Sequence, residues 1–265
     1  MLKLLKTILF LLLLILIAIP AEAQRWKILR YEASFGIGTC NIFGDIGGSA
    51  TRSNLYGLKD IKLTTSRPSL VLGVRYKLEE NMALKLNLNF CMGGGSDAGS
   101  IHATEQRAYT FTSLLFEQSM QYEYYIIHED AVKKSAAVFN RRGMMNNYSK
   151  ISVYGFAGLG GLYYMPSLKG TTPTPSMETR LGSGYTLTVP FGIGAKLVYS
   201  DHWSFNAELG YHYTLSDGLD GLTSVGSHAN DIYWLLQVSA IYRIRTSRNG
   251  LPEFMENWFQ RKLGR

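Results

Sequence analysis

Charged side chains stand at alternate positions inside otherwise apolar stretches of this chain. Acids and bases held together in one enclosed space could transfer protons, or they could neutralise one another. Five of these positions are basic and four are acidic, and buried charges are tolerated when they are paired. The sequence therefore predicts a structural network of ion pairs rather than a catalytic centre, with one histidine included: Arg30, Glu32, Arg75, Lys85, Glu117, Glu123, Lys196, Glu208, His212 and Arg243.

His212 is the one histidine within these stretches, and it follows Glu208 by four residues. In an extended strand this spacing places both residues on one face but about 13 Å apart. We therefore expect a hydrogen-bonded histidine that does not contact Glu208. A hydrolase would need an exposed Ser beside a His and an acid, and the alternation brings no such set together. No metal or cofactor is expected, because the Cys and His residues lack ligand spacing.

The stretches that carry these residues alternate apolar and polar side chains, which is typical of β-strands. Residues 151–164 contain so many glycines that the two faces of this segment are not assigned. Pro190 cannot donate to a strand ladder, so it is expected at a strand end or a bulge. Eight strands are predicted, over residues 26–38, 69–78, 82–94, 114–126, 151–164, 186–198, 203–214 and 234–244.

The apolar faces of seven of these strands carry no charge, which bears on what those faces touch. A soluble barrel of lipocalin type would turn them inward, whereas a membrane barrel turns them to lipid, where a Lys or Arg costs about 2–4 kcal/mol at the midplane. Tyrosines and tryptophans also gather at the strand ends, as in membrane girdles. Long connections alternate with tight turns at 79–81 and 200–202. The prediction is an all-β fold, an eight-stranded antiparallel up-and-down transmembrane β-barrel.

The first residues predict export. Lys3 and Lys6 precede an apolar run that ends in Pro20 and Ala-Glu-Ala, which is typical of a cleaved signal peptide. Cleavage after Ala23 removes those two lysines and Glu22, so the net charge changes from +7 to +6. The basic residues are scattered, and nucleic acid is not an expected partner. The expected organisation is a signal peptide over 1–23, an outer-membrane barrel over 24–246 in a gram-negative bacterium, and a periplasmic tail over 247–265.

Two segments on the periplasmic side are candidate docking surfaces. Residues 128–150 form a long connection where this topology otherwise has short turns. After the last strand, Pro252 can open a short helix with Phe254 and Trp258 on one face, and a disordered tail is an equal alternative. A periplasmic partner would meet the barrel at either segment.

Two cysteines, Cys40 and Cys91, point inward near the outer ends of the first and third strands. The second strand lies between them, so a disulfide requires the first long loop to fold inward. We therefore expect two free thiols in preference to a disulfide.

Several motifs, in their order along the chain, resemble those of PorG-type proteins. These are "FGIGTCNIFGDIGG" (35–48), "QRAYTF" (106–111), "TVPFGIGAK" (188–196), "YTLSDGLDG" (213–221) and "ANDIYW" (229–234). PorG-type proteins are outer-membrane β-barrels associated with the type IX secretion machinery. The resemblance implies a non-enzymatic structural or docking barrel, held in outer-membrane lipid, that contacts periplasmic proteins of that apparatus. A surface adhesin or narrow pore is the alternative, and a lipid-modifying membrane enzyme is a lower one.

Overall fold

The computed structural model describes residues 29–44, 46, 66–97, 109–127, 139–140, 143–144, 151–170, 178–180, 182–224, 230–247 and 250–262. The predicted signal peptide and most of the 128–150 connection lie outside these residues. Within the described residues, no helix has both the length and the apolar character needed to cross a membrane.

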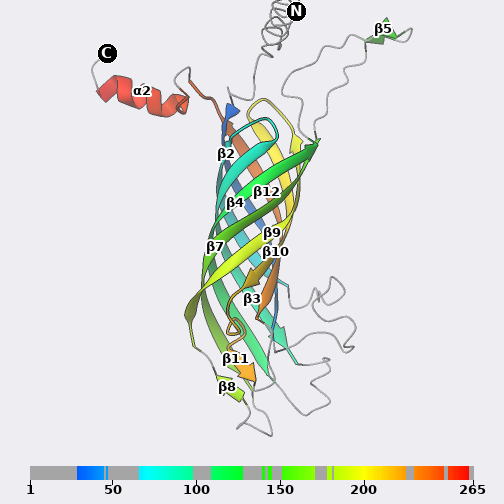
Figure 1. Cartoon of the computed structure of the whole chain (residues 1–265), viewed down its shortest axis with the longest axis vertical. Coiled ribbons are helices and arrows are strands. Elements are labelled where there is room, and N and C mark those ends of the chain that lie inside the picture. Colours follow the sequence, from blue (N-terminus) through cyan, green and yellow to red (C-terminus); the bar gives the residue numbers. More distant parts are fainter. Residues whose placement is uncertain are drawn as a thin grey trace, which may run out of the picture.

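Eight long strands pair antiparallel with their neighbours along the chain. The last of them pairs with the first, which closes the sheet into a barrel (Figure 1). The predicted eight-stranded antiparallel up-and-down barrel is therefore confirmed. Its wall consists of β1 (Tyr31–Phe43), β2 (Arg67–Lys77), β3 (Met82–Ser96), β4 (Thr110–Ile127), β7 (Ile151–Lys169), β9 (Gly184–Val198), β10 (Trp203–Thr214) and β12 (Ile232–Ile244).

The two ends of the barrel differ in their connections. At one end, which we call the loop end, β11 (Leu222–Ser224) pairs with β8 (Glu178–Arg180) beyond the wall (Figure 1). At the other, which we call the turn end, short turns join β2 to β3 and β9 to β10. The turn end also carries the two-residue strands β5 (Phe139–Asn140) and β6 (Gly143–Met144), and the helix α2 (Glu253–Lys262).

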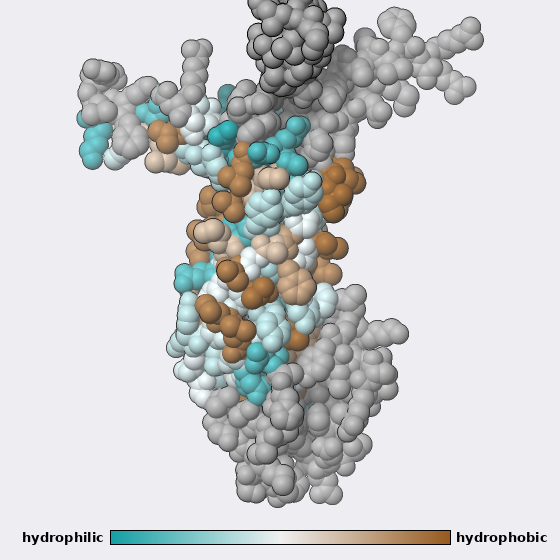
Figure 2. All heavy atoms as spheres, viewed as in Figure 1, coloured by the Kyte–Doolittle hydropathy of each residue, from teal (hydrophilic) through white to brown (hydrophobic). Residues whose placement is uncertain are grey.

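Side chains alternate between the lumen and the outer surface along every strand of the wall. In β3, Lys85 and Asn87 are buried in the lumen, whereas Leu86 and Phe90 are exposed on the outside. Figure 2 shows apolar residues spread over the outer face of the wall. An exposed apolar belt around a barrel with a polar interior is the arrangement that suits contact with lipid.

Strand β7 is the strand whose faces the sequence left open. Tyr154 and Phe156 point into the lumen and are buried, whereas Leu159 faces outward. The neighbouring strand β9 makes room for the two rings with glycines. A Cβ at Gly194 would lie 2.4 Å from Cζ of Tyr154, and one at Gly192 would lie 2.8 Å from Cζ of Phe156. The two bulky rings of β7 therefore pack over the glycines of β9, where no side chain would block them.

Two local expectations differ from the structure. The first strand begins at Tyr31 and continues to Phe43, because its far half pairs with β12 as far as Ile232. Pro190 lies inside β9 and not at a strand end, opposite His212 of β10. The ladder between β7 and β9 is interrupted at this level, which accommodates a residue that has no N–H to donate.

Candidate functional site

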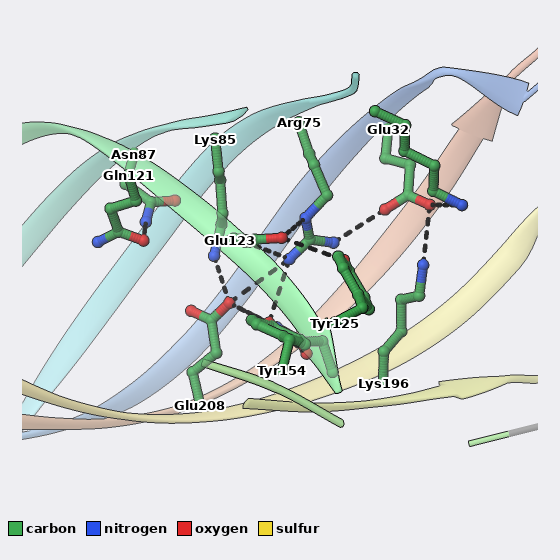
Figure 3. A network of polar contacts seen from close by, with 12 residues as sticks. Glu32, Arg75, Lys85, Asn87, Gln121, Glu123, Tyr125, Tyr154, Lys196 and Glu208 are labelled. Carbon is green, nitrogen blue, oxygen red and sulfur yellow. Dashed lines mark hydrogen bonds and ion pairs between the residues drawn. The ribbon is translucent and has the colours of Figure 1, made fainter. Parts of the chain in front are cut away.

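Arg75 lies in the lumen toward the turn end, and three carboxylates surround its guanidinium (Figure 3). One oxygen of Glu123 accepts from Nη2 at 2.8 Å, and the other forms an ion pair with Nε at 2.6 Å. Glu32 accepts from Nη1 at 2.8 Å, and an oxygen of Glu208 lies 3.6 Å from Nη2. The carboxylates come from β4, β1 and β10, so one arginine ties together three separate parts of the wall.

Glu32 is the matching centre for cations. Its Oε1 accepts from Lys196 at 3.0 Å and lies 3.3 Å from Nζ of Lys77. The strand register explains the other two contacts, because Glu32 stands directly between Arg75 on β2 and Arg243 on β12. Nε of Arg243 lies 3.9 Å away. Four cations around one buried carboxylate offset the desolvation of its charge.

Lys85 stands directly beside Arg75 across β2 and β3, a pairing of like charges that would be unfavourable alone. Its ammonium instead reaches across the lumen to Glu208, at 2.5 Å. The same Glu208 oxygen accepts from the hydroxyl of Tyr154 at 2.5 Å and from Nδ2 of Asn206 at 2.9 Å. We call this group the charged layer: Glu32, Arg75, Lys77, Lys85, Glu123, Tyr154, Lys196, Asn206, Glu208 and Arg243.

His212 lies further from the turn end, and its partner is Glu117 of β4. Nδ1 of His212 is 2.7 Å from Oε2 of Glu117, and the hydroxyl of Tyr233 donates to the same oxygen. The rings of His212 and Tyr233 are stacked, with centroids 4.6 Å apart. His212 is thus a buried lumen histidine, and its acidic partner lies on another strand.

A small cavity separates this histidine from the charged layer. Amide side chains bridge its walls: Asn87 donates to Gln121 at 2.8 Å, and Gln237 donates to Asn89 at 3.1 Å. Polar walls of this kind suit ordered water. The polar lining residues are Asn87, Asn89, Gln121, Glu208, His212 and Gln237.

Toward the loop end the lumen is filled by apolar side chains. Leu162 reaches in from β7, and the end of β1 crosses onto β3, where a Cβ at Gly93 would lie 2.1 Å from Cδ1 of Ile42. We call this group the apolar plug. Its buried members are Cys40, Ile42, Ile46, Cys91, Tyr109, Phe111, Leu115, Leu162, Tyr164, Leu219, Leu222, Tyr233 and Leu235.

Two buried aspartates fasten the connections that complete the plug. Asp220 accepts from the backbone N–H of Ile46 at 3.0 Å and from that of Leu222 at 2.9 Å. Asp231 accepts from the backbone N–H of Leu219 at 2.7 Å. Carboxylates that satisfy buried N–H groups make strong, directional bonds, so the residues after β1 and after β10 are held together over the plug.

Arg30 is the predicted lumen residue that the structure places elsewhere. Its Nη1 donates to the hydroxyl of Tyr76 at 3.0 Å, and its guanidinium lies 5.8 Å from the centre of that outward-facing ring. The alternation that predicts a lumen position applies only within the strand, and β1 begins one residue later. The other predicted residues are all buried in the lumen: Glu32, Arg75, Lys85, Glu117, Glu123, Lys196, Glu208, His212 and Arg243.

Several lumen residues were missed by the sequence reasoning. Lys77 follows Arg75 by two positions and Tyr125 follows Glu123 by two, so extending the alternation would have found both. The Tyr125 hydroxyl donates to Glu123 at 3.0 Å. Tyr154 lies on the strand whose faces were not assigned, and no comparable signal marks it.

The chemistry open to these side chains is electrostatic bracing of the wall. In the described part of the chain, no three His, Cys, Asp or Glu side chains converge as metal ligands would. The lumen carboxylates already accept from cations or from N–H and O–H donors at short range.

A family model, the outer membrane protein beta-barrel domain, matches residues 8–243. The chain belongs to this family. Barrels of the outer membrane have short periplasmic turns and longer outer loops, and the two ends of this barrel differ in the same way. Among curated proteins, none matches the chain in sequence.

The chain is also similar to several solved outer-membrane proteins. Neisserial surface protein A is 9% identical, with 80% of this chain and 96% of that one covered and a TM-score of 0.42. Ail of Yersinia pestis is 12% identical, with 81% and 98% covered and a TM-score of 0.41. The outer membrane enzyme PagL is 12% identical, with 79% and 97% covered and a TM-score of 0.32.

In this outer-membrane barrel, α2 is fastened to the rim at the turn end. The backbone N–H of Glu253 donates to the carbonyl of Arg245 at 2.9 Å, just after β12. The hydroxyl of Tyr31, at the start of β1, donates to the carbonyl of Gly250 at 3.2 Å. The residues before the helix are thus held to both the first and the last strand.

The helix itself projects sideways from the rim (Figure 1). It begins after Pro252, as predicted from the sequence, and residues 253–262 are helical instead of the disordered alternative. Phe254 and Trp258 lie one turn apart, and their side chains are 60% and 53% exposed. The other candidate docking segment, 128–150, lies outside the described residues except for β5 and β6.

Proposed function

We propose that this protein is a non-enzymatic outer-membrane barrel that acts as a structural and docking component, with periplasmic proteins of the type IX secretion machinery as its partners. The observation that carries the proposal is the filled lumen. The charged layer occupies its periplasmic half and the apolar plug occupies its outer half. The described side chains leave a small cavity between them, so the surfaces of the barrel are where it would act.

The helix α2 supports a periplasmic docking surface. Two aromatic side chains are exposed on it, and aromatic residues are the anchors that most often dominate protein interfaces. A helix on a loose tail would lose much entropy on binding, whereas one already fastened to the rim loses less. The bonds to Arg245 and Tyr31 therefore favour α2 as a preformed surface.

The PorG-type motifs support the kind of barrel that this chain forms more strongly than they support a particular binding partner. "FGIGTCNIFGDIGG" supplies Cys40, Ile42 and Ile46 to the apolar plug, and "YTLSDGLDG" supplies Leu219 and Asp220. These residues build the outer half of the lumen. The secretion role therefore rests on the family resemblance and on α2 together.

A surface adhesin is the second candidate, and one observation favours it. The bonds of Asp220 and Asp231 give the outer connections a fixed base, and rigid supports are typical of binding loops. A narrow pore is disfavoured by the filled lumen. A lipid-modifying enzyme built on the strand histidine is also disfavoured, because His212 is buried and bonded to Glu117.

Site-specific photocrosslinking in living cells tests the docking proposal. A photoreactive residue would replace Phe254 or Trp258, and the control would carry it at Leu159, which is 71% exposed on the outer face of the wall. We expect discrete protein adducts from the helix positions, identified by mass spectrometry as periplasmic secretion proteins, and lipid adducts from Leu159.

A functional readout completes the test. The double substitution Phe254→Ala and Trp258→Ala should reduce secretion of type IX cargo while the barrel keeps its heat-modifiable mobility on gels. Lipid adducts alone from both helix positions, with unchanged secretion, would contradict docking through α2. A further variant with the photoreactive residue in an outer loop would favour the adhesin if that residue captured molecules from a second cell.

A further inference from the structure

The only two cysteines of the chain meet inside the apolar plug, although they come from strands that are not neighbours. Cys40 lies near the end of β1 and Cys91 lies on β3, with β2 between them. Cys40 is fully buried and Cys91 is 4% exposed. Both thiols are free in the structure, and they lie close enough to interact with each other.

The inward fold of the chain after β1 explains how the two thiols come together. Ile42 packs where a Cβ of Gly93 would lie, and the carbonyl oxygen of Ile46 lies 3.0 Å from where a Cβ of Gly95 would lie. Asp220 holds Ile46 in this position through its N–H. The chain beyond Cys40 thus packs on β3, which brings Cys40 and Cys91 into the same buried cluster.

We propose that Cys40 and Cys91 are a redox site, and that in the exported protein they form a disulfide that fastens β1 to β3 across the plug. The reaction is a thiol–disulfide exchange with an oxidised dithiol protein of the envelope. One thiolate attacks the disulfide of the oxidant and the second thiolate resolves the mixed disulfide. The two S–H bonds of the cysteines are lost and one S–S bond forms between them, while the S–S bond of the oxidant breaks and the oxidant leaves with two thiols.

The compartment and the burial set the timing of this reaction. Disulfides form and persist in oxidising compartments, and the bacterial periplasm is one of them. Folded as described, the pair is shielded from a protein oxidant. Exchange therefore takes place before the plug closes, during passage through the periplasm, and the finished plug then protects the bond from reductants.

Thiol counting on the intact protein tests the proposal. Cells would be quenched with acid to stop thiol exchange. The protein would then be unfolded in a neutral denaturant that contains N-ethylmaleimide, which labels free thiols, with and without prior reduction. Mass spectrometry would count the labels. We expect no labelled cysteine before reduction, two after reduction, and a crosslinked peptide pair that contains residues 40 and 91. Reduction should also lower the unfolding midpoint temperature of the purified barrel by about 5 °C.

Matched variants identify the pairing. The double variant Cys91→Ser with Met92→Cys moves the second thiol one residue along β3, to the outer face, where Met92 is exposed. It should carry two labelled cysteines, and the single variants Cys40→Ser and Cys91→Ser should carry one each. If a variant fails to reach the membrane, the wild-type thiol count still decides the matter.

Two results would overturn the proposal. The first is two labelled cysteines in the unreduced wild-type protein taken from cells. The second is a disulfide between two copies of the chain, which a non-reducing gel would show as a dimer.

Discussion

The two halves of the lumen are built on opposite principles. In the half toward the turn end, Arg75 and Glu32 each contact several charges of opposite sign, and these contacts tie distant strands together. In the outer half, Leu162 and its neighbours exclude water by packing. The first half depends on complete pairing and the second on close fit, so they should respond differently to substitution.

The largest expected effect is at the centre of the charged layer. Arg75→Met leaves Glu32, Glu123 and Glu208 buried without their shared cation, and should cost about 3–5 kcal/mol of folding free energy. Urea unfolding in lipid vesicles, followed by the mobility of unboiled samples on gels, measures the loss. Arg67→Ala, at the exposed far end of the same strand, is the control and should change little. Equal stability of the two variants would rule out a central role for Arg75.

The next effect is in the apolar plug. Leu162→Ala opens a cavity where the side chain is fully buried, and should cost about 2–3 kcal/mol, since the loops above it can partly collapse. The matched substitution is Leu159→Ala on the same strand, which faces lipid. A larger loss at position 159 than at 162 in the same urea titration would show that the plug contributes little.

A double-mutant cycle measures how much the contact between Lys85 and Glu208 contributes to the stability of the charged layer. Lys85→Met and Glu208→Gln each break the 2.5 Å contact, but Glu208 keeps its bonds from Tyr154 and Asn206. The sum of the two single losses in the free energy of unfolding should exceed the loss in the double variant by about 1–2 kcal/mol, which is the coupling energy. Strict additivity would mean that the cross-lumen contact contributes no stability.

The smallest effect is expected where the two halves meet. Tyr233→Phe keeps the ring stacked on His212 and removes only the hydroxyl that donates to Glu117. Since His212 still contacts that carboxylate, the cost should be about 1 kcal/mol. Thermal unfolding monitored by near-ultraviolet circular dichroism would detect it, with Tyr199→Phe at an exposed position as the control.

The sequence alone was sufficient to predict the barrel fold and to predict that most of the charged side chains lie on the lumen side of the wall. A period of two residues fixes the face, and a membrane forbids charges on the outer one, so Glu32 and Lys196 could be assigned to the lumen. This alternation could not assign the two faces of β7, because its glycines have no side chain whose polarity would indicate a face. It took the rings of Tyr154 and Phe156, packed over Gly194 and Gly192, to show which way that strand turns.

The partners of the lumen residues were beyond the reach of the sequence. Glu208 and His212 lie on one strand, yet each bonds to side chains from across the barrel. Which residues meet across a lumen depends on the stagger between strands and on the width of the barrel, and neither is written in one strand alone. Arg30 shows the same limit at a strand end, because it lies one residue before β1, where the alternation no longer assigns a face.

The position of Glu32 also bears on how the barrel is assembled. It lies on the first strand, between Arg75 of the second and Arg243 of the last. During insertion the first and last strands are the two free edges, and the carboxylate gains its full set of cations only when those edges join. A slip of one residue at the seam would turn Arg243 toward the hydrocarbon. The ion pair between Arg243 and Glu32 therefore stabilises one register between the first and last strands over the registers next to it.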